Sequence, residues 1–370
     1  MRQFGASVGG VTGAFRAMFY PSIKLGSHWY GYSAVEVNSE PYYYWEAYSN
    51  SREVNSYTLQ AFVGYSRSAE KTAISIKAGK LASAFGSFPL RYDDTANPLL
   101  DMPVTYGTWL GIRADQLPCG INDLLRQRSY RFVRFSCGGS KNLNYWGIWP
   151  ETVYGIPGAE LDFSYNRIDG RLQITNSSPA NPHSFLSDSQ NVQWTAGAGY
   201  TIRQGFRVGF SAFRGPWLDE EVGDLLPAGK GYGDYPASGE GIDVQWARGR
   251  WSATGELQWL QYRYPGFRTS PAIYSEYIEA KAILSPRFYA AIRTSFQQHN
   301  RPEDLQRLSS KPFQPNLQYY EFALGLHLNH FQTLKLGYEW VRAAGIPGNR
   351  ENVIGVQIVT SINSLTKAFK

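Results

Sequence analysis

The chain has 370 residues, of which 43% are hydrophobic and only 18% charged, and its formal net charge is +6. Aromatic residues and glycine are abundant (26 Tyr, 11 Trp and 37 Gly), which argues against a helical protein. The modest charge without a Lys/Arg-rich run speaks against nucleic-acid binding. The two cysteines exclude a disulfide-rich scaffold and show no zinc-site spacing.

No segment predicts a transmembrane helix, because no window holds 18 consecutive apolar residues. The mean hydropathy of −0.37 resembles that of a soluble protein. A membrane β-barrel has a similar value, however, since its lipid-facing and lumen-facing residues alternate. The first 20 residues lack the continuous apolar core of a signal peptide, because glycines and Arg16 interrupt it. Either the protein is not exported, or the sequence is a mature or truncated chain.

In chain order, the sequence repeats one signature, in which two stretches of alternating apolar and polar residues are joined by a short turn. A less regular pair at 11–25 and 29–38 comes first, and a pair at 57–66 and 71–79 follows. An Asp-Gly signal then predicts a hairpin turn at 168–170. The remaining predicted hairpins span 192–215, 241–260, 277–296 and 318–341, and 352–362 is a last, unpaired strand.

Long connections alternate with these short turns along most of the chain, and they are rich in Pro, Gly, Asp and Asn. This alternation predicts an all-β fold, an up-and-down antiparallel transmembrane β-barrel with short periplasmic turns and long extracellular loops. Residues 1–370 then form a single barrel domain. The long connections lie near 39–55, 81–153, 178–191, 214–240, 264–271, 298–317 and 343–351.

The patterns indicate fifteen strands, and we expect about sixteen because single-chain bacterial barrels have an even number. The missing strand either lies within 107–136 or precedes 11–25. In the second case, the chain would begin inside the mature domain.

The composition of the apolar face favours contact with lipid over a soluble core. A soluble β-sandwich fills this face with Val, Ile and Leu, whereas here it is rich in aromatic residues near strand ends. Aromatic rings at these levels form the interface girdles of membrane barrels. The alternative is a soluble barrel, propeller or sandwich pair, which would need no detergent. The aromatic residues are Trp194, Tyr200, Trp246, Trp251, Trp259, Tyr320, Tyr338 and Trp340.

Two stretches resemble known barrels: "IKAGKLASAFGSFPLRYDDTANPLLDMPVTYG" (76–107) and "GAGYTIRQGFRVGFSAFRGPWLD" (197–219). The chain resembles bacterial outer-membrane porins, especially the phosphate-selective-porin-like and carbohydrate-porin-like families of 16-stranded barrels. The resemblance implies an outer-membrane location among lipid and lipopolysaccharide, small hydrophilic solutes as cargo, a homotrimer and no cofactor.

The connection 81–153 is much longer than a hairpin needs, and such loops are usually functional or disordered. By resemblance to porins, it is the candidate constriction or plug of the lumen. The alternative is a surface loop that binds anionic lipids. A cationic lining would favour anions. The predicted constriction residues are Arg113, Arg126, Arg128, Arg131, Arg134, Asp93 and Asp94, and the two aspartates either pair with arginines, bind a divalent ion or serve only in turns.

Cys119 and Cys137 flank the Arg-rich stretch, and in an oxidising compartment we expect a disulfide between them. The polar face of the strands carries charges that either line a pore or merely pair across strands. These predicted lumen-facing charges are Arg171, Arg207, Lys281, Arg293, Lys335, Glu256, Glu279, Glu321 and Glu339.

The sequence gives little support to an enzyme. Its five histidines show no metal-ligand spacing, and no nucleophile, phosphate-loop or dinucleotide motif is present. We therefore predict a porin-like channel for passive diffusion of small hydrophilic solutes, with an anion preference. The competing hypothesis is a non-conducting structural or adhesive barrel that acts through its surface loops.

Overall fold

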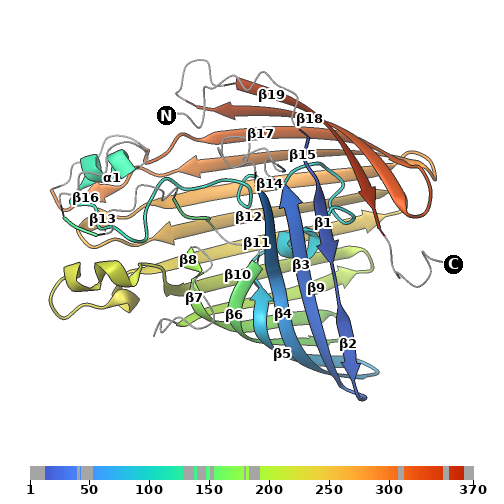
Figure 1. The fold of residues 1–370 in the computed structure, drawn as a ribbon, viewed down its shortest axis with the longest axis horizontal. Helices are drawn as coiled ribbons and strands as arrows, with labels where there is room; N and C mark the ends of the chain where they lie inside the picture. The colour runs from blue at the N-terminus through green and yellow to red at the C-terminus, as the bar shows by residue number, and fades with distance from the viewer. Residues whose placement is uncertain are drawn as a thin grey trace.

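The computed structural model describes residues 13–39, 42, 53–127, 137–139, 147–150, 154–178, 181–182, 192–306, 312–344 and 350–361. Antiparallel strands dominate, and each long strand pairs with its neighbour in the chain (Figure 1). None of the helices within these residues is long and apolar enough to span a membrane. The first strands are β1 (Arg16–Phe19), β2 (Ser22–Leu25), β3 (Trp29–Ser39), β4 (Val54–Ala69), β5 (Thr72–Ala82), β6 (Tyr154–Tyr165), β7 (Ile168–Ser178), β8 (Asn181–Pro182) and β9 (Val192–Arg203).

The second half of the chain continues the same sheet as a meander. A separate two-stranded ribbon, β13 with β16, lies among its connections. The elements are β10 (Phe206–Pro216), β11 (Pro236–Arg248), β12 (Trp251–Tyr262), β13 (Phe267–Thr269), β14 (Ala272–Ile283), β15 (Phe288–His299), β16 (Glu303–Asp304), β17 (Leu317–His327), β18 (Gln332–Ala343) and β19 (Arg350–Thr360), with the short helices η2 (Phe88–Arg91), α1 (Ile121–Gln127), η3 (Glu220–Leu225) and η4 (Tyr232–Asp234).

Tight turns and long connections segregate to opposite ends of the strands, which we name the turn end and the loop end. The turn end holds the two- to four-residue links of the hairpins, such as Gly249–Arg250 and Leu328–Phe331. The loop end holds α1, β13 and β16, which lie together in Figure 1. The hairpin turn predicted at 168–170 is wrong by two residues. Tyr165 pairs with Ile168, and Asn166 turns the chain with a positive φ of 52°, a conformation that asparagine tolerates.

The predicted total of sixteen strands is also corrected. β1 and β2 pair successively with β3 and occupy one position, and β8 is only two residues long, so the 17-stranded sheet provides fifteen positions within the described part of the chain. No ladder joins β19 to β1 or β2 among the described residues. The described part of 107–136 forms loop and helix α1, because its backbone bonds run within the connection rather than along a neighbouring strand.

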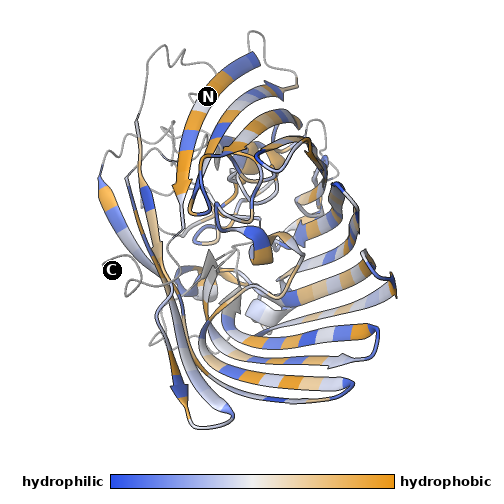
Figure 2. Ribbon diagram, turned by 90° about the vertical axis from the view of Figure 1, so that its right-hand side faces the viewer, coloured by the Kyte–Doolittle hydropathy of each residue, from blue (hydrophilic) through white to orange (hydrophobic). Residues whose placement is uncertain are grey.

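Hydrophobic and hydrophilic residues alternate along the strands (Figure 2), and their burial is inverted relative to a soluble protein. On β19, Ile354 is 77% exposed on the outer face. On the inner face, Arg293 and Gln297 are completely buried and Glu321 is 2% exposed. An apolar outer face and a polar, enclosed inner face are what a lipid-embedded barrel requires.

Candidate functional site: the lumen and its inner loop

The long connection after β5 enters the enclosed side of the sheet and runs along its inner wall. The Ala84 amide donates to Gln173 Oε1 on β7 at 3.2 Å. The Gly86 amide then donates to Ser211 Oγ on β10 at 3.1 Å. The Ser87 amide donates to Glu256 Oε1 on β12 at 2.8 Å. These successive contacts turn the first half of the connection into an inner loop, which we define as residues 83–117.

Glu256 is the main acceptor that holds this loop. Besides the Ser87 amide and hydroxyl, its carboxylate accepts from the hydroxyls of Tyr106 at 2.7 Å and Tyr277 at 2.8 Å, and from Gln258 Nε2 at 2.8 Å. Burial raises the pKa of Tyr106 well above its usual value, so its phenol stays protonated and remains a donor at neutral pH. The carboxylate is thus enclosed in donors from both loop and wall, which offsets the cost of burying it.

A buried ion network lies next along the same wall. Arg293 on β15 donates to both oxygens of Glu321 on β17, with nitrogen–oxygen distances of 2.5 and 2.6 Å. It also lies 3.2 Å from Glu279 on β14, which accepts from Arg91 of the loop at 2.8 Å. Arg293 Nη2, one of the two nitrogens that donate to Glu321, also donates to the backbone carbonyl of Asp101. This network joins two loop segments to three strands.

The middle of the inner loop bridges the first strand of the sheet and its next-to-last strand, β18. On one side, Asp94 pairs with Arg16 of β1 at 3.2 Å. On the other, the Lys335 ammonium of β18 donates to the carbonyls of Asp94, Asn97 and Leu99 at 2.7, 2.8 and 3.2 Å. Contacts through the loop therefore connect β1 with β18, the strand beside β19, across the region where no ladder between β19 and the first strands is described.

Small residues on the wall make room for this approach. A Cβ atom added at Gly337 on β18 or at Gly355 on β19 would overlap the Leu100 side chain. Both positions face the lumen, so the strands present bare backbone where the loop packs closely. Alanine at either position would require the Leu100 side chain to shift.

The loop then returns toward the loop end, where an apolar cluster covers it. Thr108 donates to Gln297 on β15 at 2.9 Å, and the Gly111 amide donates to Gln314 at 2.9 Å. The cluster packs residues of the inner loop and α1 against residues of the neighbouring connections and strand ends. It includes Leu110, Ile112, Ile121, Leu124, Phe213, Trp217, Tyr262, Tyr264 and Phe313.

The predicted constriction residues do not gather in one place. Arg113 is 4% exposed and forms a bidentate pair with Asp115 at 2.8 and 2.6 Å, within the covered loop end. Arg126 is exposed on α1. Asp93 accepts from Tyr20 and from Thr95, and Asp94 faces Arg16. Arg128, Arg131 and Arg134 lie outside the described residues. Cys119 and Cys137 form the expected disulfide, with their Cα atoms 5.3 Å apart.

The wall from β5 to β11 carries charges that the inner loop does not cover, and we call this region the open wall. Lys77 pairs with Glu160 at 2.7 Å and with Asp162 at 2.6 Å. The Lys77 and Asp162 side chains stay 23% and 26% exposed. Farther along the wall, Arg207 pairs with Asp169 at 2.6 Å and with Asp243 at 2.8 Å.

The remaining predicted lumenal charges divide between the two walls. Arg171, with a side chain that is 27% exposed, lies 3.8 Å from Asp162 on the open wall. Glu339 is 6% exposed and lies opposite Glu321 in the strand register, on the wall that the loop covers. The Lys281 ammonium lies 4.4 Å from the centre of the Tyr289 ring near the turn end. Most of the predicted charges therefore pair across the wall, as the simpler alternative held.

Several residues that position the loop escaped the sequence analysis. Ser87, Tyr106 and Arg91 act through contacts with residues 150 or more positions away, and their immediate neighbours give no signal of this. Tyr277 was also missed; its hydroxyl donates to Glu256 and accepts from Arg91. Within the described residues, no group of His, Cys, Asp and Glu side chains could hold a metal ion.

Comparison with known proteins identifies the fold alone. No family model matches the chain, and no curated protein is similar to it in sequence. Among solved structures, a loop-deletion mutant of OmpT, an outer membrane protein of Vibrio cholerae, matches 93% of this chain and 89% of its own, with a TM-score of 0.51 and 8% identity. OmpF of Salmonella typhi, in complex with daunomycin, matches 94% and 89%, with a TM-score of 0.51 and 10% identity. The chain has the fold of bacterial outer-membrane barrel proteins, in agreement with its predicted outer-membrane location.

Proposed function

We propose that the protein is a porin-like channel in the bacterial outer membrane, through which small hydrophilic solutes diffuse passively. The observation that carries this proposal is the unequal filling of the lumen. Beyond the contacts of its first residues with β7 and β10, the inner loop is bonded to the wall from β12 to β18. Lys77, Asp162, Arg171 and Arg207 on the open wall keep about a quarter of their side chains exposed. Solutes then pass between the inner loop and the open wall, and the loop sets the size limit.

The charges along this path alternate in sign, so the open wall itself favours neither ion strongly. Lys77, Arg171 and Arg207 each lie beside carboxylates. The predicted anion preference therefore rests on other cations, those of the Arg-rich stretch and those near the turn end. Arg113 does not contribute, because its charge is paired and buried.

Under this proposal, the turn end faces the periplasm and the loop end faces the outside of the cell. Short turns are typical of the periplasmic end and long connections of the extracellular end. The apolar outer face contacts lipid, and the long connections meet lipopolysaccharide. Homotrimer formation and the absence of enzymatic activity stay predictions.

A second candidate is the non-conducting structural or adhesive barrel. The apolar cluster at the loop end favours it, because Trp217, Phe313 and Ile112 are almost fully buried between the connections and cover part of the lumen. In this case the surface connections would carry the function.

Planar-bilayer recording separates the two candidates. The refolded barrel is added to a bilayer between asymmetric KCl solutions, and the single-channel conductance and reversal potential are measured. Stable conductance steps support the channel, and the sign of the reversal potential reports its ion preference. Heat-dependent gel mobility shows whether the barrel is folded. If a folded barrel gives no conductance, the result would contradict the channel and favour the second candidate.

A further inference from the structure

Two arginines lie directly opposite each other on the outer face of the sheet, at the loop end. Arg342 is the next-to-last residue of β18 and Arg350 is the first residue of β19, and they are partners in the strand register. Both are exposed, and they share the outward alternation of Leu336 and Ile354. Like charges directly opposite each other on two strands are destabilising. An anion bound between them would remove this cost.

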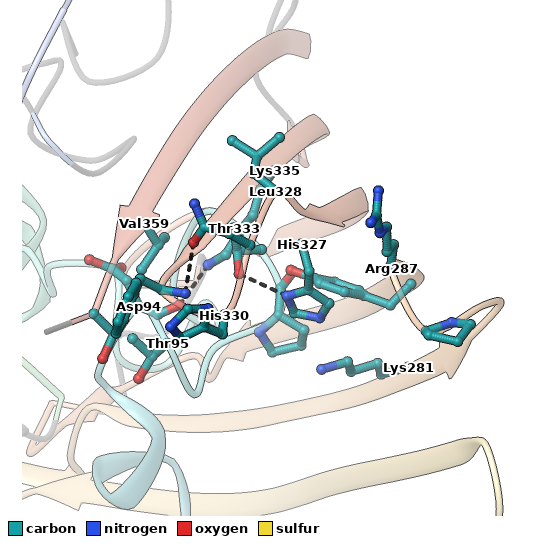
Figure 3. Close-up of a pocket in the computed structure, with 16 residues that line it drawn as sticks. Asp94, Thr95, Lys281, Arg287, His327, Leu328, His330, Thr333, Lys335 and Val359 are labelled. Carbon is teal, nitrogen blue, oxygen red and sulfur yellow. Dashed lines mark hydrogen bonds between the residues drawn. The ribbon is translucent and has the colours of Figure 1, made fainter. Parts of the chain in front are cut away.

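The described part of the chain supplies no such anion. Neither arginine side chain forms an ion pair or a hydrogen bond with a described residue. The carboxylates nearest in sequence, Glu339 and Glu351, occupy the opposite alternation and face the lumen. On that inner face of β18, by contrast, Lys335 donates to carbonyls of the inner loop and lines a pocket beside Asp94 (Figure 3). An anion for the outward pair would therefore come from the surroundings of the barrel.

The outer surface changes from charged to aromatic and then to apolar along these strands. The register row next to the arginines holds Tyr320, Trp340 and Asn352, and the rings of Tyr320 and Trp340 are 5.2 Å apart. Cations followed by aromatic rings and aliphatic side chains match the order of headgroup, interface and acyl chains in a membrane. The following two rows toward the turn end consist of exposed Phe322, Tyr338, Ile354, Leu324, Leu336 and Val356.

We propose that Arg342 and Arg350 bind the phosphate of a phosphorylated lipid in the outer leaflet. Each planar guanidinium can donate two parallel hydrogen bonds to phosphate oxygens, and the acyl chains of the lipid lie along the apolar rows. The site rests on the orientation given under the proposed function, in which the loop end faces the outside of the cell. Lipid binding does not itself require conduction.

A second copy of the chain is a less suitable occupant of this surface. The outward-facing carboxylates of the described strands include Glu240 and Glu276, and each is the fifth residue from the loop end of its strand. The arginines lie at most one residue from the ends of theirs. At about 3.4 Å per residue, these carboxylates are about 10 Å farther from the strand ends. A phosphate at the level of the headgroups matches the arginines better.

The test measures lipid binding to the detergent-solubilised barrel by native mass spectrometry. The probes are diphosphoryl lipid A and a dephosphorylated form of the same lipid. We expect the unchanged barrel to bind the diphosphoryl form about tenfold more tightly, and Arg342→Gln/Arg350→Gln to lose this preference. The matched control is Arg248→Gln/Arg250→Gln, which removes two exposed arginines from one hairpin at the turn end. It should bind the diphosphoryl form within about twofold of the unchanged barrel.

Equal binding of the two lipids by the unchanged barrel, or equal weakening in both double variants, would overturn the site. Displacement of lipid A by an equal concentration of inorganic phosphate would overturn it in favour of a dissolved anion. If Arg342→Gln/Arg350→Gln changes the number of copies in the complex but not lipid binding, the surface is a contact between copies and the lipid site is wrong. The single Arg350→Gln variant, at the first residue of β19, preserves the test if the double variant does not fold.

Bilayer recording distinguishes this proposal from the channel itself. Preference for the phosphorylated lipid in a folded but silent barrel supports the site and contradicts the channel. A conducting barrel without this preference does the reverse.

Discussion

The two walls of the lumen carry the same kinds of charged residue but hold them in different environments. On the covered wall, Arg293 and Glu321 are almost completely buried and are bonded to each other and to the loop backbone. On the open wall, the side chains of Arg207 and Asp169 are 25% and 40% exposed, although they also form a close pair. The difference comes from the inner loop, which excludes water from one wall and not from the other.

Under the proposed channel function, this comparison assigns two purposes to the lumenal charges. A desolvated ion pair is costly to break, because the remaining partner stays buried and uncompensated. A water-exposed pair contributes little to stability and remains available to passing ions. We therefore assign the covered wall to structure and the open wall to the solute path, and the following predictions test this division.

The largest effect on stability is expected from Arg293→Met. The substitution leaves Glu279 and Glu321 buried without their shared cation, so we expect the free energy of unfolding to fall by about 3–5 kcal/mol. Unfolding in urea of the detergent-solubilised barrel measures it. The double variant Arg293→Met/Glu321→Gln should recover much of the loss, since Glu321 then carries no unpaired charge and Glu279 keeps its pair with Arg91. A loss below about 1 kcal/mol in the single variant would contradict the account of the covered wall.

Reduction of the Cys119–Cys137 disulfide removes a cross-link from the connection 81–153 and leaves the residues of the two walls unchanged. It therefore tests whether the disulfide or the contacts with the wall hold the inner loop. The two cysteines are 18 positions apart, and chain-entropy arguments give a loss of about 3 kcal/mol on reduction. The same urea titration with and without reductant measures the difference. Because the inner loop is bonded to the wall independently, the mean conductance should not change, and a large increase would show that the cross-link holds the loop.

Tyr106→Phe removes one donor from Glu256 while it preserves the ring. We expect a loss of about 1–3 kcal/mol in the free energy of unfolding and noisier open-channel current, because a buried carboxylate loses a partner and the loop loses a contact. Tyr274→Phe is the matched control, since its hydroxyl is on the outer face and contacts Glu276 at 3.3 Å. Equal effects of the two substitutions would contradict the anchoring role of Glu256.

Arg207→Met should have the smallest effect on stability and a clear effect on ion selectivity. Its pair with Asp169 is partly exposed, so we expect a loss below about 1 kcal/mol. Loss of the cation leaves Asp169 and Asp243 unpaired on the open wall, and the reversal potential should move toward cations. An unchanged reversal potential with a large loss of stability would reverse the roles of the two walls.

The sequence predicted the barrel class and the inward charges, but not which wall the loop covers. Alternation of apolar and polar residues along β17 and β18 depends on neighbours two positions apart and is therefore visible in the sequence. The contacts of Ser87 with Glu256 and of Leu100 with Gly337 depend on how a long connection crosses the lumen. The same long-range packing determines that Arg113 pairs with Asp115 and does not face an open pore.

The most direct test replaces a serine on the open wall and a serine buried on the covered wall by cysteine, and compares how the two cysteines react with a thiol reagent. Ser75 on β5 is partly exposed beside the open wall, and Ser295 on β15 is completely buried behind the inner loop. Each is replaced in turn, as Ser75→Cys and Ser295→Cys, and the channel is exposed to a negatively charged thiol reagent during recording. We predict a stepwise change in conductance for Ser75→Cys and none for Ser295→Cys. Modification at Ser295→Cys but not at Ser75→Cys would contradict a solute path along the open wall.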